Sequence, residues 1–220
     1  MPRPTAPGPP PMSFRKPLPM PASPTAPASP IKSGDARLLF IRHGSAMRMT
    51  EDLRDPGLTT RGRDEAAATA SQLAVALAGI SPHLLASPLA RTQETAAIIG
   101  AAIGCRAVLA PAFAEVPWTD GQPVVSRAAD ITDWLGRGWG DMPAAQQRWA
   151  GDVVAAARQL TGLVVVVSHF VPINVMVGHA RGSDRVLEFR PRPASVTIIT
   201  RNGGDFAIES LGSEDETLFA

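Results

Sequence analysis

The feature that most limits the fold of this chain is an alternation of short apolar segments with longer segments of helical periodicity. LVVVVS (163–168) is the clearest apolar segment, because its odd and even positions are both apolar up to the final serine. A strand of this kind needs cover on both faces, which is typical of a parallel sheet between two layers of helices. The pattern predicts an α/β fold, a three-layer α/β/α sandwich with a mainly parallel sheet.

The other predicted elements follow the same alternation. Further strands are predicted at 36–41, 83–87 and 105–110, with a closing hairpin at 195–200 and 205–211. Helices are predicted at 60–78, from Pro88 to about Ile103, over 123–161 with breaks at glycine and proline, and at 172–180. Thr59 and Ser87 precede two of these helices, and we expect their side chains to act as N-caps.

The N-terminal part of the chain differs in composition from the rest. Residues 1–30 include 12 prolines, and proline neither donates to a sheet nor continues a helix. We predict a disordered, proline-rich tail over 1–34, which is a solvated leader, a ligand for a proline-binding partner or a weak basic anchor. A later methionine is an alternative start of the chain. Residues 35–220 are expected to form the single domain, with 117–150 as a helical cap or lid.

Composition and charge exclude several classes of function. The net charge is +1, which gives no global reason to expect binding to nucleic acid. No apolar stretch reaches the ~18 residues that a membrane span needs, and the N-terminus lacks the apolar core of a signal peptide. Cys105 is the only cysteine, so an internal disulfide is impossible. We therefore expect a cytoplasmic protein with neither nucleic-acid nor membrane partners.

Cationic and imidazole side chains follow three of the predicted strands. Arg42 and His43 come directly after the first strand, and His169 follows LVVVVS. Arg91 lies one turn into the helix that follows the strand at 83–87. The carboxyl ends of parallel strands meet at one edge of a sheet, where such folds bind their ligands. Because arginine bonds two phosphate oxygens at once, these side chains predict a site for a small phosphorylated anion.

The histidines are also candidates for metal ligands. They show no close pairing with one another or with the cysteine, and the candidate pocket holds two arginines. Positive charge of that kind disfavours a bound cation. We therefore predict no metal and no cofactor.

Five segments of the chain resemble motifs of the histidine phosphatase superfamily, also called phosphoglycerate mutase-like. They lie within residues 36–200 and are RHG (42–44), LTTRGRDEA (58–66), SPLARTQETA (87–96), FAEVPW (113–118) and VVVSHF (165–170). RHG alone would be weak evidence, but five segments in the family's order make a specific match. The resemblance implies a phosphoglycerate mutase-like fold.

The resemblance also implies roles for the site residues. His43 would attack phosphorus as the nucleophile and become phosphohistidine, which splits one difficult displacement into two easier ones. Arg42, Arg91 and His169 would bind the phosphoryl oxygens and offset charge in the transition state. Glu115 would protonate the leaving oxygen and then activate water, which requires a carboxyl group that is protonated part of the time.

Two assignments within this site stay open. Asp120 lies near Glu115 in the sequence and is an alternative general acid, and Asp130 and Asp133 are more remote alternatives. Ser45 directly follows the RHG turn, so we expect it to line the phosphate pocket.

The chain departs from the family pattern at two positions. Ala46 stands where the family often has Thr or Glu, so one hydrogen bond in the pocket is missing or is supplied elsewhere. Phe170 stands where the family often has Gly, and its ring would narrow the pocket or shift His169. Neither change removes a group of the implied catalytic core.

The expected function is a metal-independent phosphomonoesterase that acts on a small organic phosphate. The segment between Glu115 and His169 is rich in tryptophan and poor in basic residues. That composition favours a phosphatase over a mutase, which must hold a bisphosphorylated intermediate. The alternatives are a phosphoglycerate-type mutase and a catalytically inactive phosphate-binding or interaction protein that uses the proline-rich tail. The sequence indicates neither the natural substrate nor the oligomeric state.

Overall fold

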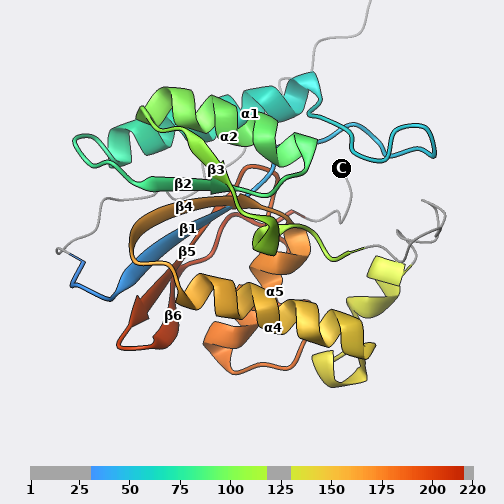
Figure 1. Ribbon diagram of the computed structural model, residues 1–220. Helices are drawn as coiled ribbons and strands as arrows, with labels where there is room; N and C mark the ends of the chain where they lie inside the picture. Colours follow the sequence, from blue (N-terminus) through green and yellow to red (C-terminus); the bar gives the residue numbers. More distant parts are fainter. Residues whose placement is uncertain (1–30, 118–129, 216–220) are drawn as a thin grey trace, which may run out of the picture.

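The computed structural model describes residues 31–117 and 130–215, which are built around a six-stranded sheet of order β3-β2-β4-β1-β5-β6 (Figure 1). The strands are β1 (Ala36–Arg42), β2 (His83–Ala86), β3 (Ala107–Leu109), β4 (Gly162–Ser168), β5 (Val196–Asn202) and β6 (Asp205–Ser210). The pairs β3–β2, β2–β4 and β4–β1 are parallel. β5 pairs antiparallel with β1, and β6 pairs antiparallel with β5. The prediction of an α/β fold with a mainly parallel sheet is confirmed.

Helices cover both faces of the sheet, as Figure 1 shows. One face carries α1 (Thr60–Ala76) and α2 (Ala90–Ile103), and the other carries α4 (Ala144–Arg158) and α5 (Phe170–Arg181). Short 3-10 turns lie at Pro111–Phe113 and Trp139–Asp141. The layers are therefore helix, sheet and helix.

The side chains of β1 alternate between two hydrophobic cores, one under each helical layer. Leu39 and Ile41 belong to the core that includes residues of α1 and α2, and Leu38 and Phe40 belong to the core under α4 and α5. All four side chains are fully buried. Burial of a side chain of this size contributes about 1.5–3 kcal/mol, so β1 is held firmly from both sides. This fixes the position of the residues at its carboxyl end.

The ends of three elements differ from the sequence prediction. α5 begins at Phe170 and not at 172, because Pro172 falls in the first turn, where backbone N–H groups have no partner within the helix. α2 begins at Ala90, so the prediction that Ser87 is its N-cap is wrong. β3 has three residues and lies exposed at the edge of the sheet. Thr59 caps α1 as predicted, with its hydroxyl oxygen accepting from the Gly62 N–H at 3.0 Å.

Part of the predicted domain organisation lies outside the described residues. This holds for 1–30 of the predicted tail and for 118–129 of the predicted cap, so both remain predictions. The described part of the cap contains a helical segment at 130–134 and the first half of α4, whereas the rest of α4 lies beyond the predicted cap. Within the residues that the structure describes, no helix is both long and apolar enough to cross a membrane.

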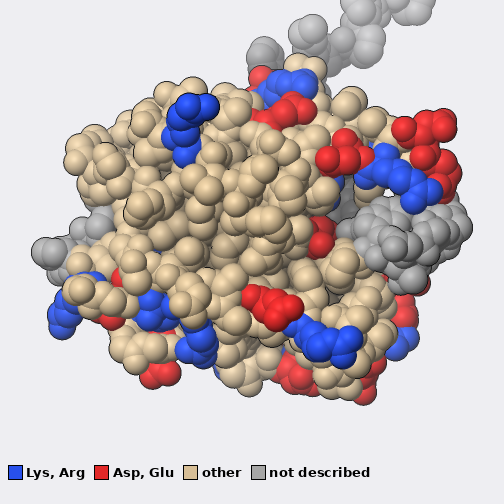
Figure 2. Space-filling view, in the orientation of Figure 1, with Lys and Arg blue, Asp and Glu red and all other residues tan. Residues whose placement is uncertain are grey.

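Charged side chains are unevenly distributed on the face shown in Figure 2. Acidic and basic groups gather at its upper right, where the loop that follows β1 lies in Figure 1. The middle of the face is uncharged and overlies α2 and β3, where Val108 is 63% exposed and Leu109 is 53% exposed. The charge-rich loop is continuous with the candidate site.

Candidate active site

The predicted site residues meet at the carboxyl edge of the parallel strands. Arg42 ends β1 and is followed by His43, and His169 follows β4. β4 lies between β1 and β2 in the sheet, so the carboxyl ends of all three strands are neighbours. The rings of His43 and His169 lie with their centroids 5.2 Å apart at an interplanar angle of 63°. The structure thus brings together side chains that are far apart in the sequence.

The His43 ring is held in one tautomer. Its Nδ1 lies 2.7 Å from the Gly44 carbonyl oxygen, which can only accept, so Nδ1 carries the proton. Nε2 therefore has a free electron pair, toward which the Arg91 Nε–H donates at 3.2 Å. Burial, followed by the positive charges of Arg91 and Arg42, lowers the pKa of His43 well below its ordinary value of about 6.5. The lowered pKa favours the neutral ring, whose Nε2 is turned toward Arg91.

Arg42 is buried with part of its hydrogen-bonding capacity unused. The residue is 8% exposed, and one terminal nitrogen donates to the Pro191 carbonyl oxygen at 2.8 Å. Its Nε is buried and has no hydrogen-bond partner among the described residues. The phenyl ring of Phe170 lies under the guanidinium, 5.3 Å from ring centroid to Cζ. Burial lowers the pKa of Arg42, and Glu115 is the carboxylate that most opposes this shift.

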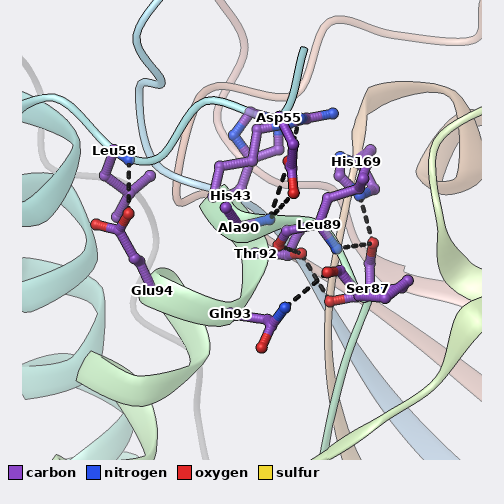
Figure 3. Close-up of polar contacts among 12 residues, drawn as sticks. His43, Asp55, Leu58, Ser87, Leu89, Ala90, Thr92, Gln93, Glu94 and His169 are labelled. Atoms are coloured by element: carbon purple, nitrogen blue, oxygen red, sulfur yellow. Dashed lines mark hydrogen bonds and ion pairs between the residues drawn. The ribbon is translucent and has the colours of Figure 1, made fainter. Parts of the chain in front are cut away.

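Arg91 and Asp55 connect the loop after β1 with the start of α2. The Asp55 carboxylate accepts from the Ala90 N–H, with both oxygens 3.0 Å away, and lies 3.6 Å from an Arg91 terminal nitrogen. Figure 3 shows Asp55 above the first residue of the helix. A negative charge is favoured there, because the N-terminus of a helix carries partial positive charge. Asp55 was not predicted from the sequence, and it holds the loop against the residue that contacts His43.

Ser87 was predicted from the sequence only as an N-cap, and its contact with His169 was not. Its hydroxyl oxygen lies 2.7 Å from His169 Nε2, and both residues are fully buried. Figure 3 shows the two side chains pointing toward each other across the edge of the sheet. The sequence pattern that could have indicated this contact is the position of Ser87 at the carboxyl end of a strand, a position shared by the other site residues. Ser87 orients the imidazole of His169.

Glu115 lies close enough to both arginines to influence them. It is half-buried, its charge acts on Arg42 and Arg91, and one carboxylate oxygen accepts from the Val116 N–H at 3.0 Å. Its negative charge thus acts on both guanidiniums, and its role as the acid stays a prediction.

The alternative acids lie elsewhere or outside the described residues. Asp133 forms an ion pair with Arg137 one helical turn away and is exposed. Asp120 lies outside the described residues, and Asp130 belongs to the helical segment at 130–134. Asp133 is therefore engaged in a local ion pair, and the choice of Glu115 as the acid stays a prediction.

Ser45 is bonded to a carboxylate rather than left open to the pocket. Its N–H donates to one Glu65 oxygen at 2.8 Å and its hydroxyl donates to the other at 3.1 Å. Arg61 donates to the same carboxylate at 2.8 Å. The role of Ser45 in phosphate binding stays a prediction, because both its donors already have partners.

Two glycines let α1 approach the turn that carries His43. A Cβ on Gly44 would lie 2.3 Å from the Gly62 carbonyl oxygen, and a Cβ on Gly62 would lie 2.0 Å from the Ser45 carbonyl oxygen. Both distances are far below any real carbon–oxygen contact. The start of α1 is thus packed directly on the backbone of the candidate site.

The grouping of possible metal ligands bears on whether this site could hold a cation. Among them, no three His, Cys, Asp or Glu side chains gather in a way that could hold a metal ion. The groups around His43 are instead two arginines and a second histidine, which together suit an anion.

Comparisons with known proteins agree with this geometry. The family model described as the histidine phosphatase superfamily (branch 1) matches residues 38–214. A curated relative, the probable phosphoglycerate mutase GpmB of Enterobacter sp. (strain 638), is 36% identical over 84 residues. That match spans 36% of this chain and 38% of the relative, so the chain matches well under half the relative's length.

Solved structures with the same fold include proteins named as phosphatases. One is a putative alpha-ribazole-5'-P phosphatase from Escherichia coli, with a TM-score of 0.62, 21% identity, and coverage of 81% of this chain and 96% of that chain. Another is a mycobacterial glucosyl-3-phosphoglycerate phosphatase in complex with VO3, with a TM-score of 0.59, 20% identity, and coverage of 81% and 99%. At such identities the likeness shows a phosphoglycerate mutase-like fold.

Proposed function

Because the chain belongs to the histidine phosphatase superfamily (branch 1), we propose that it is a metal-independent phosphomonoesterase that hydrolyses a small organic phosphate through phosphohistidine at His43. The observation that carries this proposal is the state of the His43 ring. Its Nδ1 proton is bonded to a backbone carbonyl, its Nε2 accepts from Arg91, and the charge of Arg42 acts on the ring as well. An unprotonated ring nitrogen in a cationic pocket is the arrangement that a nucleophile for a phosphate ester needs.

In the first step, His43 Nε2 attacks phosphorus as the bond to the leaving oxygen breaks. Arg42 and Arg91 bind the equatorial oxygens with charge-assisted hydrogen bonds, and His169 binds the phosphoryl group from the neighbouring strand. Glu115 gives its proton to the leaving oxygen, so the product is a neutral alcohol. The Arg91 Nε–H that donates to His43 in the free protein turns to the phosphoryl group.

In the second step, a water molecule attacks phosphorus opposite the ring. Glu115, now a carboxylate, accepts a proton from the water. The nitrogen–phosphorus bond breaks, its electron pair returns to Nε2 of His43, and inorganic phosphate leaves. The two arginines supply the positive charge that a metal ion would otherwise provide, which is the reason for proposing a metal-independent reaction.

The second candidate function is a mutase, favoured by the similarity to a probable phosphoglycerate mutase. It uses the same nucleophile but returns the phosphoryl group to the substrate instead of to water. Transfer of phosphate between the positions of a phosphoglycerate, faster than release of inorganic phosphate, would identify a mutase.

The test is phosphate release from p-nitrophenyl phosphate in the presence of EDTA by the full chain and by His43→Ala. We expect turnover by the wild type and loss of at least ~10²-fold in the variant. His83→Ala, which changes an exposed histidine of β2, is the matched control and should leave turnover unchanged. Phosphohistidine in the wild type, stable in alkali and labile in acid, should be absent from His43→Ala. Full activity of His43→Ala, or dependence of the wild type on a metal, would refute the proposal.

A further inference from the structure

The residue after the second site histidine has an unusual environment for its position. Phe170 is the first residue of α5, directly after His169, and is 8% exposed. From the sequence, a large side chain here was expected to narrow the pocket or to shift the histidine. The structure instead places the ring in the core beneath the guanidinium of Arg42.

Some groups of the Arg42 guanidinium have partners in the described part of the structure, and others do not. The ring centroid of Phe170 lies 5.3 Å from Cζ, within the range of a cation–π interaction, so one face is covered. One terminal nitrogen is bonded to the Pro191 carbonyl oxygen at 2.8 Å. What remains is the edge with Nε, which is buried and has no hydrogen-bond partner among the described residues.

An unpartnered, buried donor is costly, and its cost is removed when an acceptor binds. Nε and the second terminal nitrogen form a side-on pair of donors, which matches two oxygens of a phosphoryl group. Arg42 can offer this pair only while its plane is fixed. The hydrogen bond to the Pro191 carbonyl oxygen fixes one end of the guanidinium plane, and the Phe170 ring fixes the tilt of that plane.

We propose that Phe170 is a positioning residue for phosphate recognition, which holds the plane of Arg42 so that its Nε edge meets the phosphoryl group. The inference rests on the proposed function, because the phosphoryl group is the substrate of that site. Phe170 itself does not touch the substrate in this scheme and acts through Arg42. An aromatic face suits this role because it stabilises the cation without using any of its N–H donors.

The chain contains a second arginine–phenylalanine pair that serves as a matched control. Arg158 lies over the ring of Phe206 with Cζ 5.4 Å from the centroid, and Phe206 is also 8% exposed. Phe206 is the second residue of β6 and pairs with Arg201, which pairs in turn with Ala36 at the amino end of β1. Phe206 therefore lies at the opposite end of the strands from the site. The rings are equally buried and lie at similar distances from their arginines, but Arg158 is exposed whereas Arg42 is buried. Phe206 is therefore matched for the ring, its exposure and its distance from a guanidinium, and it lies away from the candidate site.

The first experiment compares Phe170→Leu with Phe206→Leu in the full chain. Both changes keep an apolar side chain and remove the aromatic face, and the thermal midpoint of each variant is measured beside its activity. For Phe170→Leu we expect kcat/KM for p-nitrophenyl phosphate and affinity for orthovanadate to fall by about tenfold to thirtyfold, the value of a desolvated cation–π contact. Phe206→Leu should keep both quantities at the wild-type level.

The second experiment separates a cation–π role from simple filling of space. Stepwise fluorinated phenylalanines at position 170 keep the shape of the ring but weaken the negative charge of its face. We expect orthovanadate affinity to fall in steps with fluorination, while the thermal midpoint changes little. Fluorinated rings at position 206 should leave the affinity unchanged.

The outcomes distinguish this inference from the proposed function. Folded Phe170→Leu that binds orthovanadate and inorganic phosphate as tightly as the wild type overturns the inference alone. Equal affinity across the fluorinated series also overturns it, since it would show that the ring only fills space. Wild-type protein that binds these anions without turnover overturns the proposed function but still tests the role of Phe170 by affinity. Wild-type protein that binds neither anion overturns both.

Discussion

Gly62 offers a direct test of how closely α1 packs on the site. A Cβ at this position would lie 2.0 Å from the Ser45 carbonyl oxygen, and both groups belong to the backbone, so no rotamer change relieves the contact. Overpacking of this kind costs about 1–3 kcal/mol, at the upper end here, whereas alanine in a helix regains only about 0.5–1 kcal/mol. We expect Gly62→Ala to lower the free energy of unfolding by about 2 kcal/mol, or the thermal midpoint by about 4–8 °C.

Gly151 is the control for this change, because it is also a helical glycine. A Cβ on it would have no atom within 4 Å, so Gly151→Ala should gain about 0.5–1 kcal/mol and raise the thermal midpoint. Urea unfolding at pH 7 measures both free energies, and p-nitrophenyl phosphate hydrolysis reports on the turn that carries His43. Only Gly62→Ala should lose activity. A Gly62→Ala protein as stable as Gly151→Ala would refute the close approach of α1 to the turn.

Three further predictions concern buried or charged groups. Ser87→Ala removes the partner of His169, so unfolding free energy should fall by about 1–3 kcal/mol and orthovanadate affinity should fall with it, as calorimetry can measure. Arg37 lowers the pKa of Glu209, so this pair stabilises the fold fully above about pH 4.5, and its contribution is lost as pH falls through the folded-state pKa. The stability difference between wild type and Glu209→Gln should therefore shrink between pH 7 and pH 3.5 in urea titrations. The lowered pKa of His43 predicts that its ring, followed by NMR, stays neutral as pH falls through about 6.5; protonation at that pH would contradict the buried cationic setting.

The central part of the site was accessible from the sequence because it depends on local position in a regular fold. Arg42, His43 and His169 directly follow apolar segments that must be buried strands, and Arg91 follows another by one helical turn. In a parallel sheet these positions converge at one edge, whatever the details of packing. The layers and the mainly parallel sheet followed from the same apolar patterns.

The supporting contacts were not accessible, since each depends on the distance between segments that are remote in the sequence. Asp55 reaches the start of α2 only because the loop after β1 folds over it, and Ser87 meets His169 only because β2 and β4 are neighbours. Local preference predicted a cap at Ser87, but tertiary contact placed its hydroxyl elsewhere. The stacking of Phe170 on Arg42 likewise follows from the pairing of β1 with β4.

The end of β4 has a consequence for how the protein acquires its function during folding. Ser168 donates to the Phe113 carbonyl oxygen, 55 residues away, His169 contacts Ser87, 82 residues away, and the next ring meets the arginine that ends β1. Contacts of such long sequence separation form late in folding, because the chain must first lose the conformational entropy of closing large loops. The side chains of the candidate site come from all of these segments. If the proposed site binds an anion, that anion should stabilise the folded domain as a whole, because its partners come from three strands and the helices between them.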